Sequence, residues 1–157
     1  MKNPRHMSTA ISKFHYKVLQ NTKMFGGVSQ MTSQQFEAVN GYSNNFWGWG
    51  GEDDQMYLRL KIAGMKLQRP VPQNSSRWTM IPHNHESSNS ANPKRKDLVK
   101  KTGPKQWKLD GLNSLQYDLK DREVVGEGLF TRFDVDIHAP HKFTEVYPDL
   151  IQSPAFQ

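Results

Sequence analysis

The sequence contains no cysteine, which excludes disulfide bonds and thiolate metal sites. It also has no apolar run near the roughly 20 residues that a membrane-spanning helix needs, and the start, Met1-Lys2-Asn3-Pro4, lacks the apolar core of a signal peptide. Hydrophobic residues make up only 35% of the 157, and the mean hydropathy is −0.80. We expect a single domain with a modest core and no targeting or anchoring segment in this stretch.

Positive charge is in excess, with 21 Lys and Arg against 15 Asp and Glu, a net charge of +6 and a pI near 9.6. This balance suits a partner that carries phosphate, although a solvated basic face explains it equally well. Many of the cations fall in one stretch, which suits a diphosphate or a nucleic-acid backbone as well as a solvated loop. They are Lys94, Arg95, Lys96, Lys100, Lys101, Lys105 and Lys108.

Two helices are predicted in the first half of the chain. Thr32 and Gln35 have the spacing of a capping box, and the helix that they begin should stop at Asn40-Gly41. The second helix is expected over 53–63, where apolar residues recur at helical spacing, with Gly64 as its stop.

Strands are predicted at two places. Residues 65–69 alternate in polarity as far as Pro70, and residues 131–137 alternate more clearly after a glycine turn at 126–128. Between these strands, residues 84–108 show little periodicity over about 25 positions, which is typical of a functional lid or of disorder. The last 20 residues are proline-rich and are expected to form an irregular tail.

The stretch Phe46 to Asp54 has the composition of a binding site. It sets Trp47 and Trp49 among glycines and ends in Glu52, Asp53 and Asp54 at the predicted start of the second helix. Exposed N–H groups at a helix start stabilise anions, and ionised carboxylates bind hydroxyl groups or accept protons. An acidic first helical turn is the simpler interpretation of the carboxylates alone, but it leaves the two tryptophans unexplained.

Two further patterns suggest metal binding. His83 and His85 are two residues apart, so extended backbone would point both imidazoles the same way, yet Met80 nearby is a poor ligand for a hard ion. Asp134-Val135-Asp136 resembles the Asp-x-Asp metal motif of enzymes that use sugar nucleotides. The alternation of residues 131–137 already explains this pair as the solvent side of a strand.

Five motifs occur in the order seen in the β-1,4-galactosyltransferase family, and the resemblance covers roughly residues 4–138. They are Phe25-Gly26-Gly27-Val28-Ser29, Trp47 to Asp54, Gly64-Met65 with Arg69-Pro70, Met80-x-x-His83, and Asp110 to Leu115. The resemblance implies an α/β fold, the C-terminal half of a GT-A type glycosyltransferase domain with a mixed sheet, short helices and a long lid loop. It further implies residues 1–138 as catalytic-domain sequence, with the lid at about 81–101, and an irregular tail at 139–157.

Roles for individual residues also follow from the resemblance. Asp53 resembles the catalytic base and Glu52 its supporting carboxylate, while Asp53, Asp54, Trp49 and Arg95 resemble the acceptor-binding set. Donor binding is implied for Met24, Gly27 and Trp49, and Met80 with His83 resembles two manganese ligands. On this interpretation the pair Asp134 and Asp136 is not the metal motif, and the true Asp-x-Asp is expected before residue 1.

The sequence departs from the family in three ways. The half that grips uridine is absent, so the chain is expected to be a fragment, and a membrane anchor is expected only in a full-length form. Lys96 stands where the acceptor pocket commonly has an aromatic residue, which weakens the expectation of GlcNAc as acceptor. Met24 stands where galactose-specific members have tyrosine, which favours UDP-GalNAc beside UDP-Gal as donor.

The resemblance implies inverting, Mn²⁺-dependent transfer of galactose or N-acetylgalactosamine from a UDP-sugar to a glycan ending in an N-acetylhexosamine. The compartment that it implies is the Golgi lumen. A catalytically inactive sugar-binding fragment is the alternative function. Nucleic-acid binding through the basic loop is a third hypothesis, and we expect no such partner.

Overall fold

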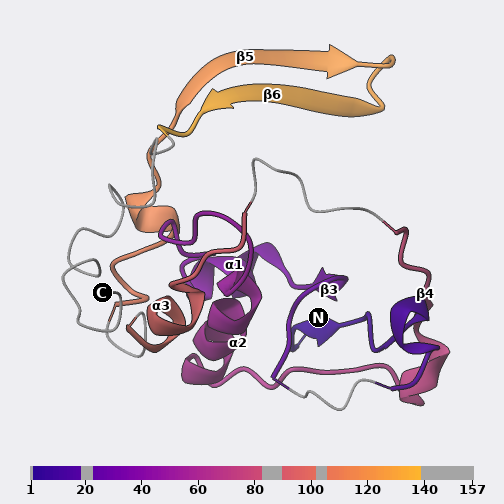
Figure 1. Cartoon of the computed structure of the whole chain (residues 1–157). Coiled ribbons are helices and arrows are strands. Elements are labelled where there is room, and N and C mark those ends of the chain that lie inside the picture. Colours follow the sequence, from indigo (N-terminus) through magenta and orange to yellow (C-terminus); the bar gives the residue numbers. More distant parts are fainter. Residues whose placement is uncertain (1, 19–22, 83–89, 102–105, 139–157) are drawn as a thin grey trace. The chain divides into compact units, whose positions relative to one another are not determined.

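The computed structural model describes residues 2–18, 23–82, 90–101 and 106–138 (Figure 1). The chain divides into two units, Met1–Ser114 and Leu115–Gln157, and each is described by itself. The predicted limits of the catalytic-domain part, 1–138, and of the tail, 139–157, stay predictions, since the tail lies outside the described residues. No helix in the described ranges is long and apolar enough to cross a bilayer.

Helix α1 spans Ser33–Ala38 and begins with the predicted capping box. Gln35 N–H donates to Thr32 Oγ1 at 3.1 Å, and Thr32 N–H donates to Gln35 Oε1 at 3.0 Å, so both exposed donors are satisfied. The helix ends where Asn40 and Gly41 take φ of 57° and 62°. The left-handed backbone at this pair confirms the predicted stop.

Helix α2 spans Glu52–Ile62, one residue longer at its start than predicted, and Gly64 N–H closes its end by donating to Lys61 O at 3.1 Å. Its buried face supplies Met56 and Leu60 to the core of the first unit, which also contains Phe25 and Val39. The core is small, as the composition predicts. It holds α2 beside α1 (Figure 1).

The strands of the first unit are short. Strand β1 (Arg5–His6) pairs antiparallel with β3 (Ser29–Gln30), and β2 (Ala10–Ile11) pairs parallel with β4 (Arg77–Trp78). Three 3₁₀ turns complete the connections, η1 (Ser12–Phe14), η2 (Gln73–Ser75) and η3 (Leu112–Ser114).

The prediction of a strand at residues 65–69 is wrong. Only Gln68 forms a bridge, with Arg5, because its single neighbour is the two-residue strand β1. The prediction of a long loop at 84–108 is also wrong in part, because helix α3 spans Arg95–Lys101 within this stretch. The rest of that stretch is described only at 90–94 and 106–108.

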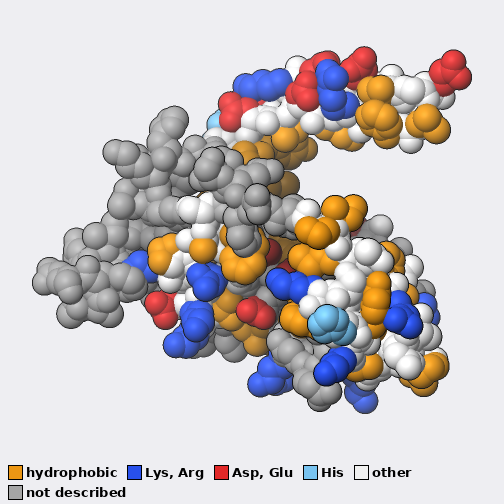
Figure 2. Space-filling view, turned by 45° about the vertical axis from the view of Figure 1, so that its right-hand side comes forward, with side chains coloured by type: hydrophobic (Ala, Val, Ile, Leu, Met, Phe, Trp, Pro, Cys, Tyr) orange, Lys and Arg blue, Asp and Glu red, His pale blue; other side chains and the backbone are white. Residues whose placement is uncertain are grey.

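The second unit is a hairpin of β5 (Asp118–Val125) and β6 (Phe130–Asp136), joined by the predicted glycine turn. The strand predicted at 131–137 is thereby confirmed. Charged side chains share one face, where Arg132 pairs with Glu123 at 3.1 Å and with Asp134 at 3.4 Å. Apolar side chains share the other face (Figure 2). Asp134 and Asp136 therefore lie on the charged side of a strand, as their alternation predicts.

Candidate functional site

A cavity of about 690 Å³ opens at the N-terminus of α2, a volume that suits a small ligand. Its lining includes six residues for which the sequence analysis predicts a role in the site. They are Met24, Trp49, Glu52, Asp53, Asp54 and Arg95. Residues up to 71 positions apart thus meet at one helix start, and their part in binding stays a prediction.

The tryptophan loop reaches the cavity because it pairs with the segment before α3. Trp49 N–H donates to Ser90 O, and Asn92 N–H donates to Trp49 O, both at 3.0 Å. The Trp49 side chain remains 48% exposed, which leaves aromatic surface for a ligand. Gly50 is required at its position, because its φ is 102° and a Cβ atom would lie 2.8 Å from Arg95 Cδ.

The carboxylates of the first turn of α2 repel one another in a partly buried place. The pKa of Asp53 is raised by burial, then by the charges of Glu52 and Asp54. Gly26 allows this carboxylate to approach the backbone, because a Cβ there would overlap Asp53 Oδ2. A carboxyl group with a raised pKa is a better proton acceptor than an ordinary aspartate.

Glu52 presents a buried acceptor to the cavity. Within the described residues, its Oε2 has no hydrogen-bond partner. A buried oxygen without a partner carries a desolvation cost, which a ligand hydroxyl would remove. The negative charge of these carboxylates also acts on Tyr42, whose pKa is raised by burial and then by the charges of Asp53 and Glu52.

Arg59 and Asp110 hold the loop that leads to the tryptophans, and sequence reasoning did not identify this pair. Arg59 is fully buried, and its Nη2 lies 3.3 Å from Asp110 Oδ2. Asp110 accepts hydrogen bonds from Ser43 Oγ and, at 2.9 Å, from Asn44 N–H. The available signal in the sequence was the position of Arg59 next to Leu60 in the helix. An arginine that is buried beside a core residue requires hydrogen-bonding or charged partners.

Asn92 is a second positioning residue that the sequence did not reveal. It is fully buried, and its carbonyl accepts from Arg95 N–H at 3.3 Å and from Arg95 Nη1 at 2.9 Å. Its Oδ1 accepts from Lys94 N–H at 2.8 Å, so the residue orders the start of α3 while its backbone binds Trp49. The local signal was Asn92 before Pro93, a common helix entry.

Gly27 does not line the cavity, unlike Met24. Its φ is 74°, and a Cβ atom there would lie 2.6 Å from Ser8 Oγ, which Val28 N–H contacts at 3.0 Å. Packing against Ser8 therefore explains this glycine, and its part in donor binding stays a prediction.

The predicted manganese ligands are described only in part. His83 lies outside the described residues, and Met80 is exposed, with its N–H donating to Ser12 Oγ at 2.8 Å. A thioether and an imidazole are two donors, fewer than the roughly six of an octahedral manganese site. These two residues do not form a complete site, and their part in metal binding stays a prediction.

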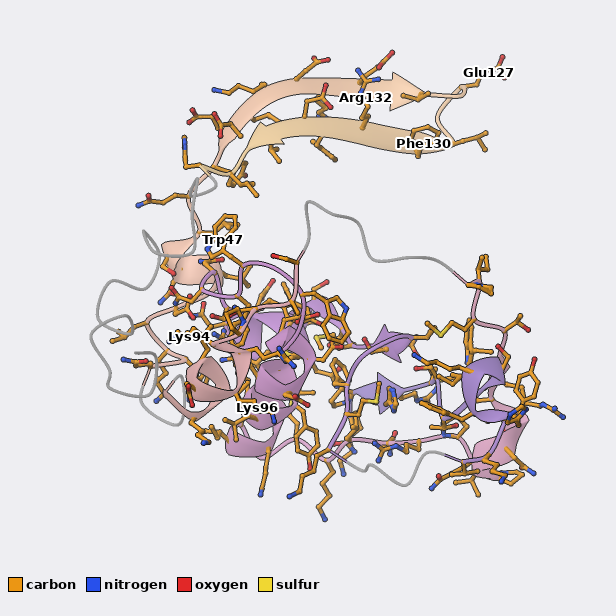
Figure 3. The ribbon with its side chains drawn as sticks, in the orientation of Figure 1. Trp47, Lys94, Lys96, Glu127, Phe130 and Arg132 are labelled. Atoms are coloured by element: carbon orange, nitrogen blue, oxygen red, sulfur yellow. The ribbon has the colours of Figure 1, made fainter. Side chains whose placement is uncertain are left out.

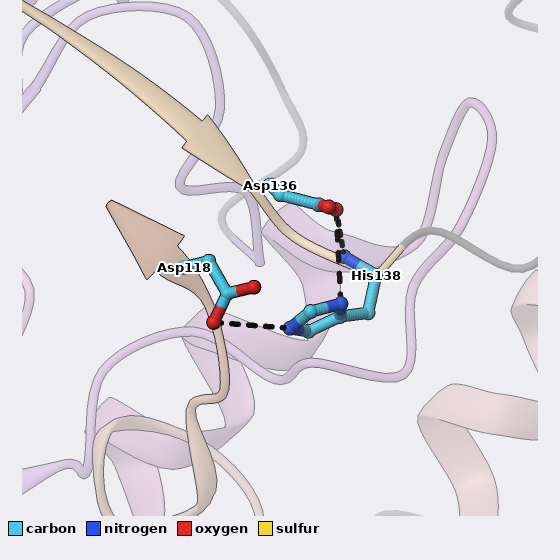
Figure 4. Close-up of side chains that lie close together, drawn as sticks. All are labelled: Asp118, Asp136 and His138. Carbon is cyan, nitrogen blue, oxygen red and sulfur yellow. Dashed lines mark hydrogen bonds and ion pairs between the residues drawn. The ribbon is translucent and has the colours of Figure 1, made fainter. Parts of the chain in front are cut away.

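Asp118, Asp136 and His138 form a separate group in the second unit, with ligand-type atoms within 4.8 Å of one another (Figure 4). Lys120 Nζ already lies 3.1 Å from Asp118 Oδ2 and 3.7 Å from Asp136 Oδ2. The pKa of Asp136 is lowered mainly by the hydrogen bond from His138 N–H. The ammonium of Lys120 thus neutralises this exposed group, which explains it as an ion-pair cluster.

Comparisons with known proteins agree with the motifs. A family model described as the N-terminal domain of galactosyltransferase matches residues 5–84, half of the chain. The chain is 42% identical over 136 residues to human β-1,4-galactosyltransferase 3 and 44% identical over 137 residues to mouse β-1,4-galactosyltransferase 1. Each match covers 87% of this chain and 33% of the relative, so the chain spans about a third of the length of these relatives.

Solved structures show the same fold. The catalytic domain of Drosophila β-1,4-galactosyltransferase 7 in complex with xylobiose is 23% identical, with a TM-score of 0.64. A mutant of that enzyme in complex with manganese, UDP-Gal and xylobiose is 21% identical, with a TM-score of 0.65. Each match covers 94% of this chain and 60% of the other. At these identities the likeness establishes the fold, part of a GT-A type catalytic domain, and nothing further.

Proposed function

This chain belongs to the β-1,4-galactosyltransferase family, and from that membership we propose that it carries the acceptor side of a hexosyltransferase site. The proposed reaction moves galactose or N-acetylgalactosamine from a UDP-sugar to a terminal N-acetylhexosamine of a glycan. The observation that carries the proposal is a cavity whose lining joins Asp53 to Trp49 and Arg95. Its volume is large enough for a sugar ring and part of a donor.

In the proposed reaction, an acceptor hydroxyl oxygen attacks C1 of the donor hexose, the C1–O bond to the UDP group breaks, and Asp53 takes the hydroxyl proton. The raised pKa of Asp53 supports this role, because a base works best when its pKa approaches the working pH. Glu52 Oε2, buried without a described partner, orients an acceptor hydroxyl. Trp49 offers an exposed indole for the apolar face of a sugar ring.

Metal dependence is part of the proposal. Met80 and His83 would hold Mn²⁺ together with the donor diphosphate and further ligands. When bound, the metal neutralises the charge of the departing diphosphate. The segment 81–101 serves as a lid in the proposal, and its described part already contacts the tryptophan loop through Asn92. The Golgi lumen is the proposed compartment, from family membership.

Sugar binding without transfer is the second candidate function. The observation that favours it is that the cavity and its carboxylates lie within residues 23–100, so acceptor binding needs only this part of the chain.

Replacing Asp53 by Asn tests the transferase proposal. The protein is incubated with UDP-galactose or UDP-GalNAc, Mn²⁺ and N-acetylglucosamine, and released UDP is measured. We expect turnover by a full-length form that carries the donor-binding half and its loss in Asp53→Asn, because the amide cannot accept the proton. The 157-residue chain alone is expected to release no UDP. Asp121→Asn, an exposed change in the hairpin, is the matched control and should keep full activity.

The outcomes separate the two candidates. Equal rates in Asp53→Asn and the unaltered protein would remove Asp53 from the mechanism. Acceptor binding without any UDP release, in a correctly folded full-length form, would favour the sugar-binding function over the transferase.

A further inference from the structure

We propose that the acceptor glycan bound in this cavity is anionic. It would carry a sulfate, phosphate or carboxylate group beside the sugar unit whose hydroxyl group gives its proton to Asp53. The inference rests on the proposed function and adds the substrate class. A neutral N-acetylhexosamine needs stacking and hydrogen bonds only, whereas this cavity has a strongly basic wall. Five cationic residues line it, against the three carboxylates of the first turn of α2: Lys23, Lys61, Arg95, Lys96 and Lys100.

Four of the five cations of the basic wall lie on two helices, α2 and α3. Lys61 lies seven residues after Asp54 on α2, hence on the same side of the helix and about 10 Å further along its axis. Lys96 and Lys100 are one turn apart on α3, so they also share a face. Figure 3 labels Lys96, which extends from α3. Negative charge therefore lines one end of the cavity and positive charge lines another part of its wall.

Two of these cations, Lys61 and Lys96, do not pair with the acids of the cavity. In the described part of the chain, neither Lys61 nor Lys96 lies within 4.0 Å of a carboxylate. Lys100 pairs with Asp97 at 3.9 Å, and both side chains are well exposed, so this pair is weak. The pKa of Asp53 agrees with this separation, since it is raised by burial and then by the charges of Glu52 and Asp54.

The distance along α2 places the anionic group. A sugar ring at the first turn of α2 spans only part of the roughly 10 Å from Asp54 to Lys61, so the charge belongs on a substituent or on the adjoining sugar. The donor diphosphate shares this chemistry and is the other source of negative charge. Binding of the acceptor alone separates the two sources.

The test is equilibrium binding of the 157-residue protein, followed by tryptophan fluorescence. The probes are the neutral disaccharide of two N-acetylglucosamines, the same disaccharide with one sulfate, and UDP alone. We expect the sulfated disaccharide to bind about tenfold more tightly at low salt, and the difference to shrink at high salt as exposed charges are screened. The double variant Lys61→Gln/Lys96→Gln should lose this preference.

The matched control removes the same charge elsewhere. Lys13 and Lys66 are exposed and do not line the cavity, so Lys13→Gln/Lys66→Gln should retain the preference. Equal binding of the two disaccharides, or a preference that survives in Lys61→Gln/Lys96→Gln, overturns the inference. Weaker UDP binding in that variant without any sulfate preference assigns the lysines to the diphosphate and also overturns it.

The failure of this inference is distinguishable from failure of the proposed function. If the neutral disaccharide binds and accepts a hexose with no advantage from sulfate, only the anionic substrate class is refuted. If neither disaccharide binds, the inference and the proposed acceptor site fall together.

Discussion

Replacing Arg59 by Met should strongly destabilise the first unit. Arg59 Nη1 donates to the carbonyl oxygens of Asn40 and Gly41 at 3.1 Å and 2.9 Å and lies 3.4 Å from that of Val39. Its Nη2 binds Asp110 at 3.3 Å. Methionine fills much of the volume but removes the guanidinium donor from these carbonyls and the positive charge from beside Asp110, which keeps only its hydrogen bonds from Ser43 and Asn44. Removing one partner of a buried charged network costs about 3–5 kcal/mol.

Urea unfolding of the variant and the unaltered protein measures this loss as a difference in the free energy of unfolding. The control is Arg132→Met in the hairpin, where the arginine is 53% exposed and pairs with acids on the surface. That change should cost no more than about 1 kcal/mol. If Arg59→Met costs less than about 1 kcal/mol, the guanidinium does not hold the Asn40 loop, and the reasoning from burial and hydrogen bonds is refuted.

Two further predictions concern the cavity. Asp53→Asn should raise the urea midpoint at pH 7. The pKa of Asp53 is raised in the folded state, so the unaltered protein loses stability as the pH rises above the ordinary pKa value of 3.8. Below that pH the two proteins should have the same urea midpoint. A lower midpoint for the variant at pH 7 would contradict this sign. Met24→Tyr should shift donor preference from UDP-GalNAc toward UDP-Gal by about tenfold, on the order of 1.4 kcal/mol, because a tyrosine crowds an N-acetyl group where a flexible methionine moves aside. Ratios of kcat/KM for the two donors, measured in a full-length form, give this shift, and an unchanged ratio would show that Met24 does not set donor choice.

Local signals in the sequence predicted the elements whose causes are local. The capping box of Thr32 and Gln35, the stop at Asn40-Gly41 and the alternation of β6 each depend on residues within a few positions. The association of Trp49 with Asp53 also follows from closeness in sequence. For Arg95 and Met24, however, the prediction depended on family resemblance, because no periodicity relates them to α2.

Features with long-range causes escaped prediction. Residues 65–69 alternate as a strand does, yet only Gln68 finds a backbone partner, so pairing and not polarity decided the outcome. The buried partners of Arg59 lie about 20 and 51 residues away in sequence, and no local pattern encodes them. Helix α3 was hidden by the lysines of the basic stretch, although buried Leu98 anchors it against the rest of the unit.

Different parts of helix α2 contribute to function and to stability. In its first turn the pKa of Asp53 is raised by burial and by two neighbouring carboxylates, a cost to stability that a site tolerates for function. Its second and third turns bury Met56, Arg59 and Leu60, which hold the core and the loop before the tryptophans. Changes in the first turn should therefore alter chemistry while preserving or raising stability. Changes at Arg59 should lower stability and reach the cavity only through the position of the loop that carries Trp49.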